Sequence, residues 1–126
     1  MSSIMPAPEA IRKLAQAPET GKLVMLNLLK FKPGTGAASY AEYGRQVAKI
    51  LARIGARILF AGPVAQSVAG NDGDWDAIAV VEYPSRKVFL EMGMSAEYKA
   101  IHHFRDEGLE RTELYAINSM PPMPPA

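Results

Sequence analysis

Hydrophobic residues are concentrated between Leu23 and Lys32, where the chain reads LVMLNLLKFK with turn residues on either side. A short apolar run between turn signals is typical of a β-strand that is covered on both faces. Strand side chains alternate in direction, and here each face receives an apolar row. Asn27 is the polar exception in the middle of the run. Because a buried amide must be hydrogen-bonded, Asn27 binds either a structural partner or a ligand.

The rest of the chain alternates between helical and strand periodicity. In the first half of the chain, the pattern predicts a helix over Pro8–Gln16, the strand Leu23–Lys32, and a helix that runs from a capping box at Ser39 and Glu42 to Gly55. Two strands follow, over Arg57–Val68 and Trp75–Tyr83. The last predicted elements are a short helix capped by Ser85 and interrupted at Gly93, a helix capped by Ser95 over Ala96–Arg111, and a strand over Glu113–Asn118. We expect a single domain over residues 1–126, with its core at about 21–118 and an extended Pro-rich tail at 119–126.

This order of elements, β-α-β-β-α-β after a short N-terminal helix, is the ferredoxin-like pattern. The predicted fold class is therefore α+β, with a four-stranded antiparallel sheet. Right-handed crossovers place both main helices on the same face of that sheet. The helices leave the other face uncovered, although the predicted strands offer apolar residues to both sides.

A sheet that is covered on only one face normally alternates apolar with polar residues, and these strands do not. Apolar rows left in water would form a larger hydrophobic patch than monomers normally carry. The sequence therefore predicts a homodimer in which the open sheet faces of two copies pack together about a twofold axis.

Charge and composition argue against several kinds of partner and site. The chain holds 14 basic and 13 acidic residues without a basic block, so nucleic acid and anionic membranes are not expected partners. No apolar run approaches the roughly 20 residues that span a bilayer, and no secretory signal is visible, so we expect a cytoplasmic location. The absence of cysteine excludes disulfides and sulfur-ligated metals. No metal site is expected, because the two histidines are adjacent and diverge by about 100° on a helix.

The predicted helix Ala96–Arg111 carries the candidate chemistry. One line along it holds Tyr98, Ile101, His102, Arg105 and Leu109, and the opposite line holds Lys99, His103, Asp106 and Glu110. An arginine on an apolar face is rare unless it is paired. Arg105 therefore extends its charged end to solvent, pairs with a carboxylate from Glu82, Asp76 or a second subunit, or clamps an anion or carbonyl group between helix and sheet.

His102 lies three positions from Arg105, so the two side chains are neighbours on the helix. His102 is either a core histidine with satisfied hydrogen bonds or a proton acceptor. In the second interpretation, Arg105 and Asn27 hold the negative charge on an enolate or oxyanion. The aromatic candidates for ligand binding, which could equally be core or rim residues, are Tyr43, Trp75, Tyr83 and Tyr98.

Several segments together resemble a small family catalogued as domain of unknown function 1330, within the dimeric α+β barrel superfamily. They are MLNLLKFK, SYAEY, RILFAG, WDAIAVVEYPSRKVFLEM and SAEYKAIHHFR, between about Met25 and Ala116. The matching positions are Asn27, Tyr43, Gly62, Tyr83, Pro84, Phe89, Tyr98 and Arg105. The N-terminal helix and the Pro-rich tail depart from the family pattern.

The resemblance implies the ferredoxin-like fold and the dimer, without a settled activity. Superfamily relatives include cofactor-free monooxygenases, haem-degrading enzymes and lactone isomerases, with pockets between helices and sheet. At fold level this is analogy. Our first hypothesis is an enzyme that acts on a small aromatic or carbonyl metabolite without a tightly held cofactor. The alternatives are a non-catalytic ligand-binding or stress-associated homodimer, and a purely structural dimer without a cavity.

Overall fold

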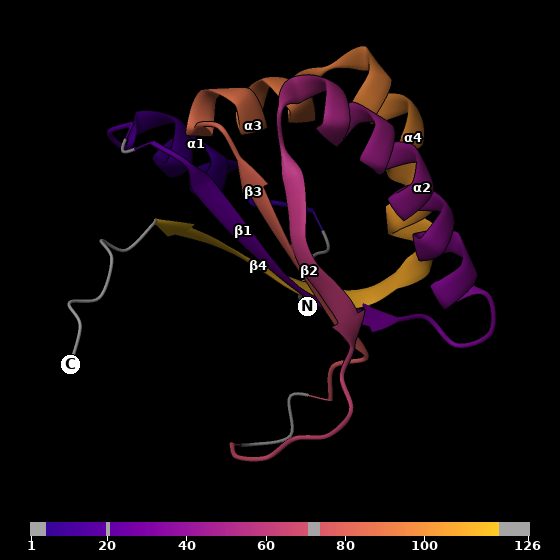
Figure 1. Ribbon diagram of the computed structural model, residues 1–126. Coiled ribbons are helices and arrows are strands. Elements are labelled where there is room, and N and C mark those ends of the chain that lie inside the picture. Colours follow the sequence, from indigo (N-terminus) through magenta and orange to yellow (C-terminus); the bar gives the residue numbers. More distant parts are fainter. Residues whose placement is uncertain (1–4, 20, 71–73, 119–126) are drawn as a thin grey trace.

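The computed structural model describes residues 5–19, 21–70 and 74–118, so the predicted Pro-rich tail lies outside the described residues. Figure 1 shows the arrangement of the elements along the chain. They are α1 (Pro8–Gln16), β1 (Leu23–Phe31), α2 (Gly36–Ile54), β2 (Arg57–Pro63), β3 (Ala77–Tyr83), α3 (Arg86–Met94), α4 (Ala96–Gly108) and β4 (Leu109–Asn118).

The four strands form one antiparallel sheet in the order β2-β3-β1-β4. Helices α2, α3 and α4 lie together on one side of it (Figure 1). This topology confirms the predicted α+β ferredoxin-like fold. Strand β1 is central, and it pairs with β3 on one side and with β4 on the other.

The structure contains the predicted serine caps of α3 and α4 but not the predicted capping box of α2. The hydroxyl oxygens of Ser85 and Ser95 each accept a backbone N–H three residues further on, at 3.1 Å, and begin α3 and α4 as predicted. The capping box at Ser39 was wrong, because α2 begins at Gly36 and the Ser39 N–H already donates to Thr35 within the helix, at 2.9 Å. Alanines at positions 37 and 38 are strong helix formers and extend the helix backwards. Gly93 does not interrupt α3, which continues to Met94.

Tertiary pairing sets the boundary between α4 and β4. The helix ends at Gly108, three residues before the predicted end, and β4 begins at Leu109. Leu109 is paired with Phe31 of β1 and is 1% exposed. Burial of this side chain in the sheet therefore outweighs its helical spacing. On the opposite edge, β2 ends at Pro63, five residues before the predicted end at Val68, because proline cannot donate to a ladder.

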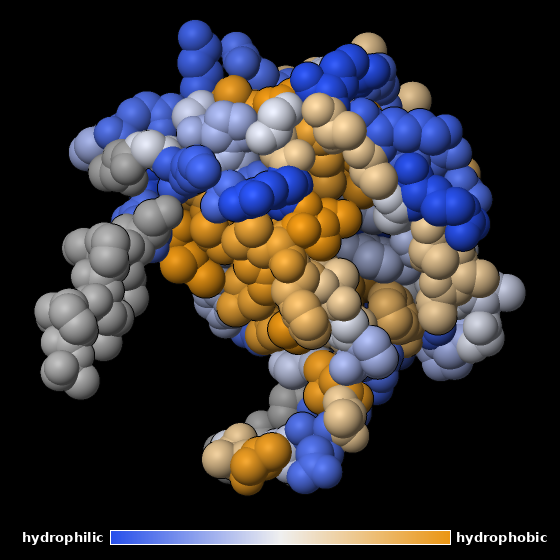
Figure 2. Space-filling model, in the orientation of Figure 1, coloured by the Kyte–Doolittle hydropathy of each residue, from blue (hydrophilic) through white to orange (hydrophobic). Residues whose placement is uncertain are grey.

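The hydrophobic core lies between the sheet and the helices. Strand residues Leu23, Met25, Val81 and Tyr83 pack there with residues of α2 and α3, namely Val47, Ile50, Leu51 and Met92. The opposite side of the sheet carries a second apolar set, in register across the strands: Val24, Leu26, Leu28, Ile78, Val80, Phe60, Tyr115 and Ile117. Figure 2 shows an apolar patch over the strands. Among the described residues, no helix has the length and apolarity needed to cross a membrane.

Candidate functional site

Six of the seven predicted site residues line one pocket between the sheet and the helices. The pocket has a volume of about 510 Å³. The predicted site residues that line it are Asn27, Tyr43, Tyr83, Tyr98, His102 and Arg105. Three of them lie on one face of α4, at spacings of four and three residues. β1 contributes Asn27 to the floor, and α2 contributes Tyr43. The fold thus brings together side chains that are up to 78 positions apart in the sequence.

Tyr43 and Tyr98 form a half-buried pair of phenols in this pocket. Their Oη atoms are 2.8 Å apart, and their rings meet edge to face with centroids 6.2 Å apart. Burial raises the pKa of Tyr43 well above its usual value, and the neighbouring Tyr98 adds to the effect. One hydroxyl donates to the other, so the pair retains one O–H donor for a ligand. Burial likewise raises the pKa of Tyr40 to about 12.

His102 is held by a carboxylate that the sequence argument missed. Its Nδ1 atom lies 3.0 Å from Oδ2 of Asp106, and its side chain is 18% exposed. A neutral ring that donates its Nδ1–H to Asp106 keeps Nε2 as an acceptor. Asp106 was predicted to lie on the opposite line of the helix. Its spacing of four residues from His102 was the signal that could have identified this pair.

Asn27 has a structural partner. Its Nδ2 atom donates to the carbonyl oxygens of Ala79 on β3 and Met25 on β1, at 3.2 and 3.4 Å. Because both partners are acceptors, the orientation of the amide is determined. Both amide hydrogens are engaged by backbone carbonyls here, and the role of Asn27 as an oxyanion donor remains a prediction. Within the described residues its Oδ1 makes no hydrogen bond, so Asn27 offers the pocket an acceptor.

Arg105 is a charged residue buried on the core side, with 5% of its surface exposed. The two carboxylates predicted as its partners bind other groups. Glu82 is 3.1 Å from Arg57 on the other face of the sheet, and Asp76 accepts the N–H of Phe31 at 2.8 Å. The guanidinium lies close enough to Tyr40, Tyr43 and Tyr83 to oppose the effect of burial on the pKa of each phenol. Arg105 therefore brings positive charge to an apolar, phenol-lined space.

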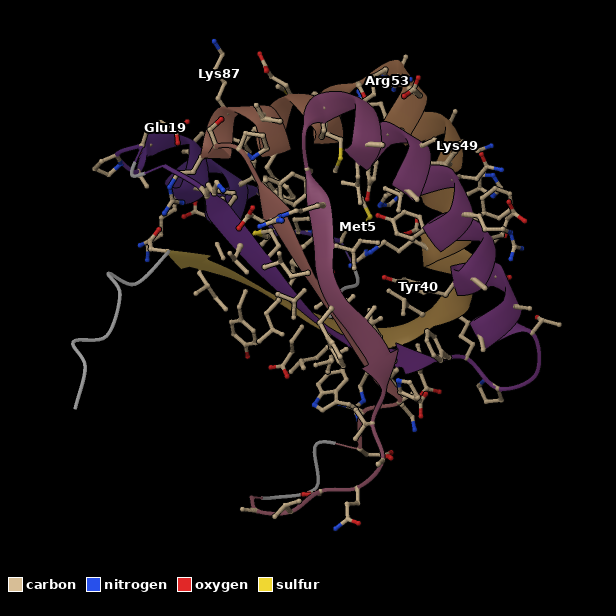
Figure 3. All side chains as sticks on the ribbon, in the orientation of Figure 1. Met5, Glu19, Tyr40, Lys49, Arg53 and Lys87 are labelled. Carbon is tan, nitrogen blue, oxygen red and sulfur yellow. The ribbon has the colours of Figure 1, made fainter. Side chains whose placement is uncertain are left out.

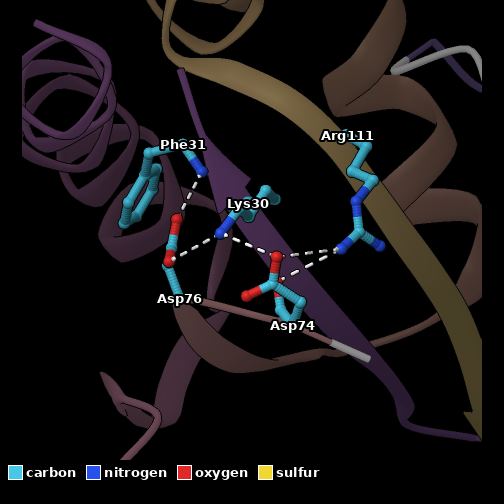
Figure 4. Close-up of polar contacts among 5 residues, drawn as sticks. All are labelled: Lys30, Phe31, Asp74, Asp76 and Arg111. Atoms are coloured by element: carbon cyan, nitrogen blue, oxygen red, sulfur yellow. Dashed lines mark hydrogen bonds and ion pairs between the residues drawn. The ribbon is translucent and has the colours of Figure 1, made fainter. Parts of the chain in front are cut away.

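Trp75, the seventh predicted residue, is not among the residues that line this pocket. The guanidinium of Arg111 lies 4.4 Å from the centroid of its ring. Next to it, Lys30 contacts Asp74 and Asp76 at 3.2 and 3.4 Å (Figure 4). These contacts attach the connection between β2 and β3 to the central strand. The structure thus places Trp75 beside a polar cluster at the end of the sheet.

The N-terminal segment supplies lining residues that the sequence argument did not identify. They are Met5 and Pro6, with Ile11 and Ala15 of α1. No residue of α1 is buried. Beyond the helix, the carboxylate of Glu19 accepts the N–H groups of Arg86 and Lys87 at 3.1 and 3.0 Å, at the start of α3 (Figure 3). The segment is thereby held beside the pocket.

In the part of the chain that the structure describes, no group of three or more histidine, aspartate or glutamate side chains is arranged to hold a metal ion. The groups in or beside the pocket that can exchange a proton or stabilise charge include His102 with Asp106, the phenols and the Arg105 guanidinium.

Comparisons with known proteins agree with this architecture. The profile of a family described as Domain of unknown function (DUF1330) matches residues 34–120. None of the curated proteins matches the chain in sequence. The crystal structure of RPA0582, a protein of unknown function from Rhodopseudomonas palustris, is 28% identical with a TM-score of 0.89, over 97% of this chain and 100% of that one.

More distant solved structures share the fold. A dimeric protein of unknown function with a ferredoxin-like fold from Bacteroides fragilis is 12% identical with a TM-score of 0.57, over 78% of this chain and 96% of that one. A proposed antibiotic biosynthesis monooxygenase from Caulobacter crescentus is 14% identical with a TM-score of 0.60, over 80% and 92% of the two chains. At these identities the likeness concerns the fold alone.

Proposed function

The chain belongs to the family described as Domain of unknown function (DUF1330), and from the geometry of its pocket we propose that it binds a small, mostly apolar carbonyl compound and exchanges a proton with it at His102. The observation that carries the proposal is the His102–Asp106 pair, 3.0 Å apart, on the same pocket as a buried guanidinium and a phenol pair. An oriented imidazole beside groups that stabilise negative charge is the arrangement that acid–base catalysis requires.

Each group has a distinct part in the proposed reaction. Asp106 orients the ring, and Nε2 of His102 takes a proton from an O–H group or from a carbon next to the carbonyl. The negative charge that forms on the substrate oxygen is stabilised by Arg105 and by the remaining O–H of the Tyr43–Tyr98 pair. Returning the proton to another atom completes an isomerisation. The same deprotonated substrate is also the species that would meet O₂ in a cofactor-free oxygenation.

We further propose that the protein is a homodimer through the open face of its sheet. Phe60 is 63% exposed and Tyr115 is 47% exposed on a monomer, and both belong to the apolar set on that face. At about 25 cal/mol per Å², covering several hundred Å² of such surface is worth many kcal/mol before the cost of association. The ferredoxin-like protein from Bacteroides fragilis is itself described as dimeric, which supports this arrangement.

The test begins with a thermal-shift screen of small aromatic and carbonyl compounds, followed by product analysis with and without O₂. On a compound that is turned over, His102→Ala should lower kcat by about 10²-fold or more with binding retained. Asp106→Ala should lower kcat by about 10- to 100-fold. Glu107→Ala is the matched control, because Glu107 contacts the exposed His103 in the same way, at 3.4 Å.

Two results would count against this proposal. If His102→Ala leaves turnover unchanged, His102 is not the proton acceptor. If the native protein binds a compound tightly but never converts it, the pocket belongs to a non-catalytic binding protein.

A further inference from the structure

A second hollow lies beside the proposed site, between α1 and β4. Its volume is about 620 Å³, and its lining includes Lys13, Arg86, Thr112 and Tyr115. It adjoins the first pocket, because the same side chains line both spaces. The shared residues include Met5, Pro6, Phe89, Arg105 and Leu114. A ligand in the first pocket therefore has room to extend past Arg105 into the second.

The charged side chains that line these two spaces all carry one sign. They are Lys13, Arg86, Lys99 and Arg105, and among the described lining residues there is no aspartate or glutamate. The chain as a whole is balanced, with 14 basic and 13 acidic residues, so the sign is a property of the site. Positive charge along apolar walls attracts anions more strongly than it would in open water.

Arg86 is built to receive such an anion. Its Nη2 donates to Oδ1 of Asn118 at 2.6 Å, which holds the guanidinium in place. Its Nε is buried and has no hydrogen-bond partner among the described residues. Because Arg86 also lines the hollow, its remaining guanidinium N–H groups can donate charge-assisted hydrogen bonds to a carboxylate there. Lys13, on the facing helix, adds a second positive charge to the same hollow.

We propose that the ligand of this protein is an elongated carboxylate, with its charged end at Arg86 and Lys13 and its reacting end beside His102. This inference rests on the proposed function and names the class of compound that the same site takes. The apolar body of the ligand crosses the shared walls at Phe89 and Leu114. In this arrangement, the second hollow under α1 selects the ligand by its charge and length. The first pocket, called the inner pocket below, holds the groups that react with it.

The test uses three probes with the same apolar body: 6-phenylhexanoate, 6-phenylhexan-1-ol and 6-phenylhexylamine. By titration calorimetry, the carboxylate should bind at least tenfold more tightly than the alcohol, and the amine more weakly than either. Phenylacetate is too short to span both spaces. It should therefore show little of the gain in affinity that 6-phenylhexanoate has over the alcohol.

Variants of the lining residues then test where the carboxylate end of the ligand binds. Arg86→Gln should weaken binding of 6-phenylhexanoate about tenfold and Lys13→Gln about threefold, with the alcohol unaffected. Lys87→Gln and Arg12→Gln are matched controls, because each removes one positive charge next to a lining residue without lining the hollow. Equal binding of carboxylate and alcohol, or an equal loss in Lys87→Gln, would overturn the inference.

The NMR signals of the His102 ring separate this failure from failure of the proposed function. If the alcohol shifts those signals as much as the carboxylate does, the inner pocket is occupied and only the inference about charge is wrong. If none of the three probes shifts them or binds, the inference falls together with the small-molecule site itself.

Discussion

The Oη atoms of Tyr43 on α2 and Tyr98 on α4 lie 2.8 Å apart and join two of the helices that cover the sheet. Tyr43→Phe should lower the free energy of unfolding by about 1 kcal/mol, because it leaves the partly buried hydroxyl of Tyr98 without its partner. The double variant with Tyr98→Phe should lower the free energy of unfolding by less than the sum of the two single changes. Denaturant unfolding measures all three. Strict additivity would show that the two hydroxyls are not coupled.

Burial also makes the stability depend on alkaline pH. It raises the pKa of Tyr40 to about 12 and that of Tyr43 well above the ordinary value of 10. The folded state thus favours the neutral phenols, so their contribution is complete below about pH 10 and is lost as pH rises through the folded values. At about pH 11, ultraviolet absorbance should show fewer than the chain's 5 tyrosines ionised in the folded protein. Ionisation of all 5 there without unfolding would contradict this.

The proposed dimer predicts that a charge introduced on the open face of the sheet weakens association of the two copies. Val80 lies near the centre of the open face, paired with Leu26 and Phe60. Val80→Glu should raise the dimer dissociation constant at least about hundredfold, because the interface would bury a carboxylate without a partner. Sedimentation equilibrium measures this, and Lys49→Glu on the exposed side of α2 is the control. A native protein that sediments as a monomer at micromolar concentration would refute the interface.

Asp76 connects the strand ends, and its contribution to stability depends on acidic pH. The Phe31 N–H, and then Lys30, lower the pKa of Asp76 from its usual 3.8. A lowered folded value means that the contribution is present above about pH 4 and is lost as pH falls through the folded value. Asp76→Ala should cost about 1 kcal/mol at neutral pH, at the low end for a charged hydrogen bond because the side chain is 37% exposed. The difference from the native protein in denaturant unfolding should shrink below pH 4. A constant difference would contradict the assignment.

Gly36 and Gly108 allow the ends of α2 and α4 to touch backbone to backbone. A Cβ at Gly108 would lie 2.8 Å from the carbonyl oxygen of Gly36 and 2.9 Å from the backbone nitrogen of Tyr40. Gly108→Ala should therefore destabilise the fold by about 1–3 kcal/mol in thermal or denaturant unfolding. Gly44→Ala, in the middle of α2 with open space around it, should be neutral or stabilising by about 0.5–1 kcal/mol. Equal effects of the two substitutions would exclude the close approach as the cause.

Much of this architecture is local in origin and could be predicted from the chain alone. The alternation over Leu23–Phe31 and the hydroxyls of Ser85 and Ser95 act within a few residues, so a periodic pattern reveals them. The spacing of Tyr98, His102 and Arg105 placed all three on one face, and they line one pocket. Even the His102–Asp106 pair is local, because the two residues are one helical turn apart.

Only the tertiary structure decided the contacts that join distant segments. The partner of Asn27 is the Ala79 carbonyl, 52 positions away, which strand pairing brings within 3.2 Å. The end of α4 depends on burial of Leu109 against β1, which outweighs the helical pattern of the sequence. Met5 lines the pocket because the chain folds back over it, and its own sequence neighbourhood contains no signal for this. Periodicity reports which way a side chain points within its element, whereas its partners depend on how the elements pack.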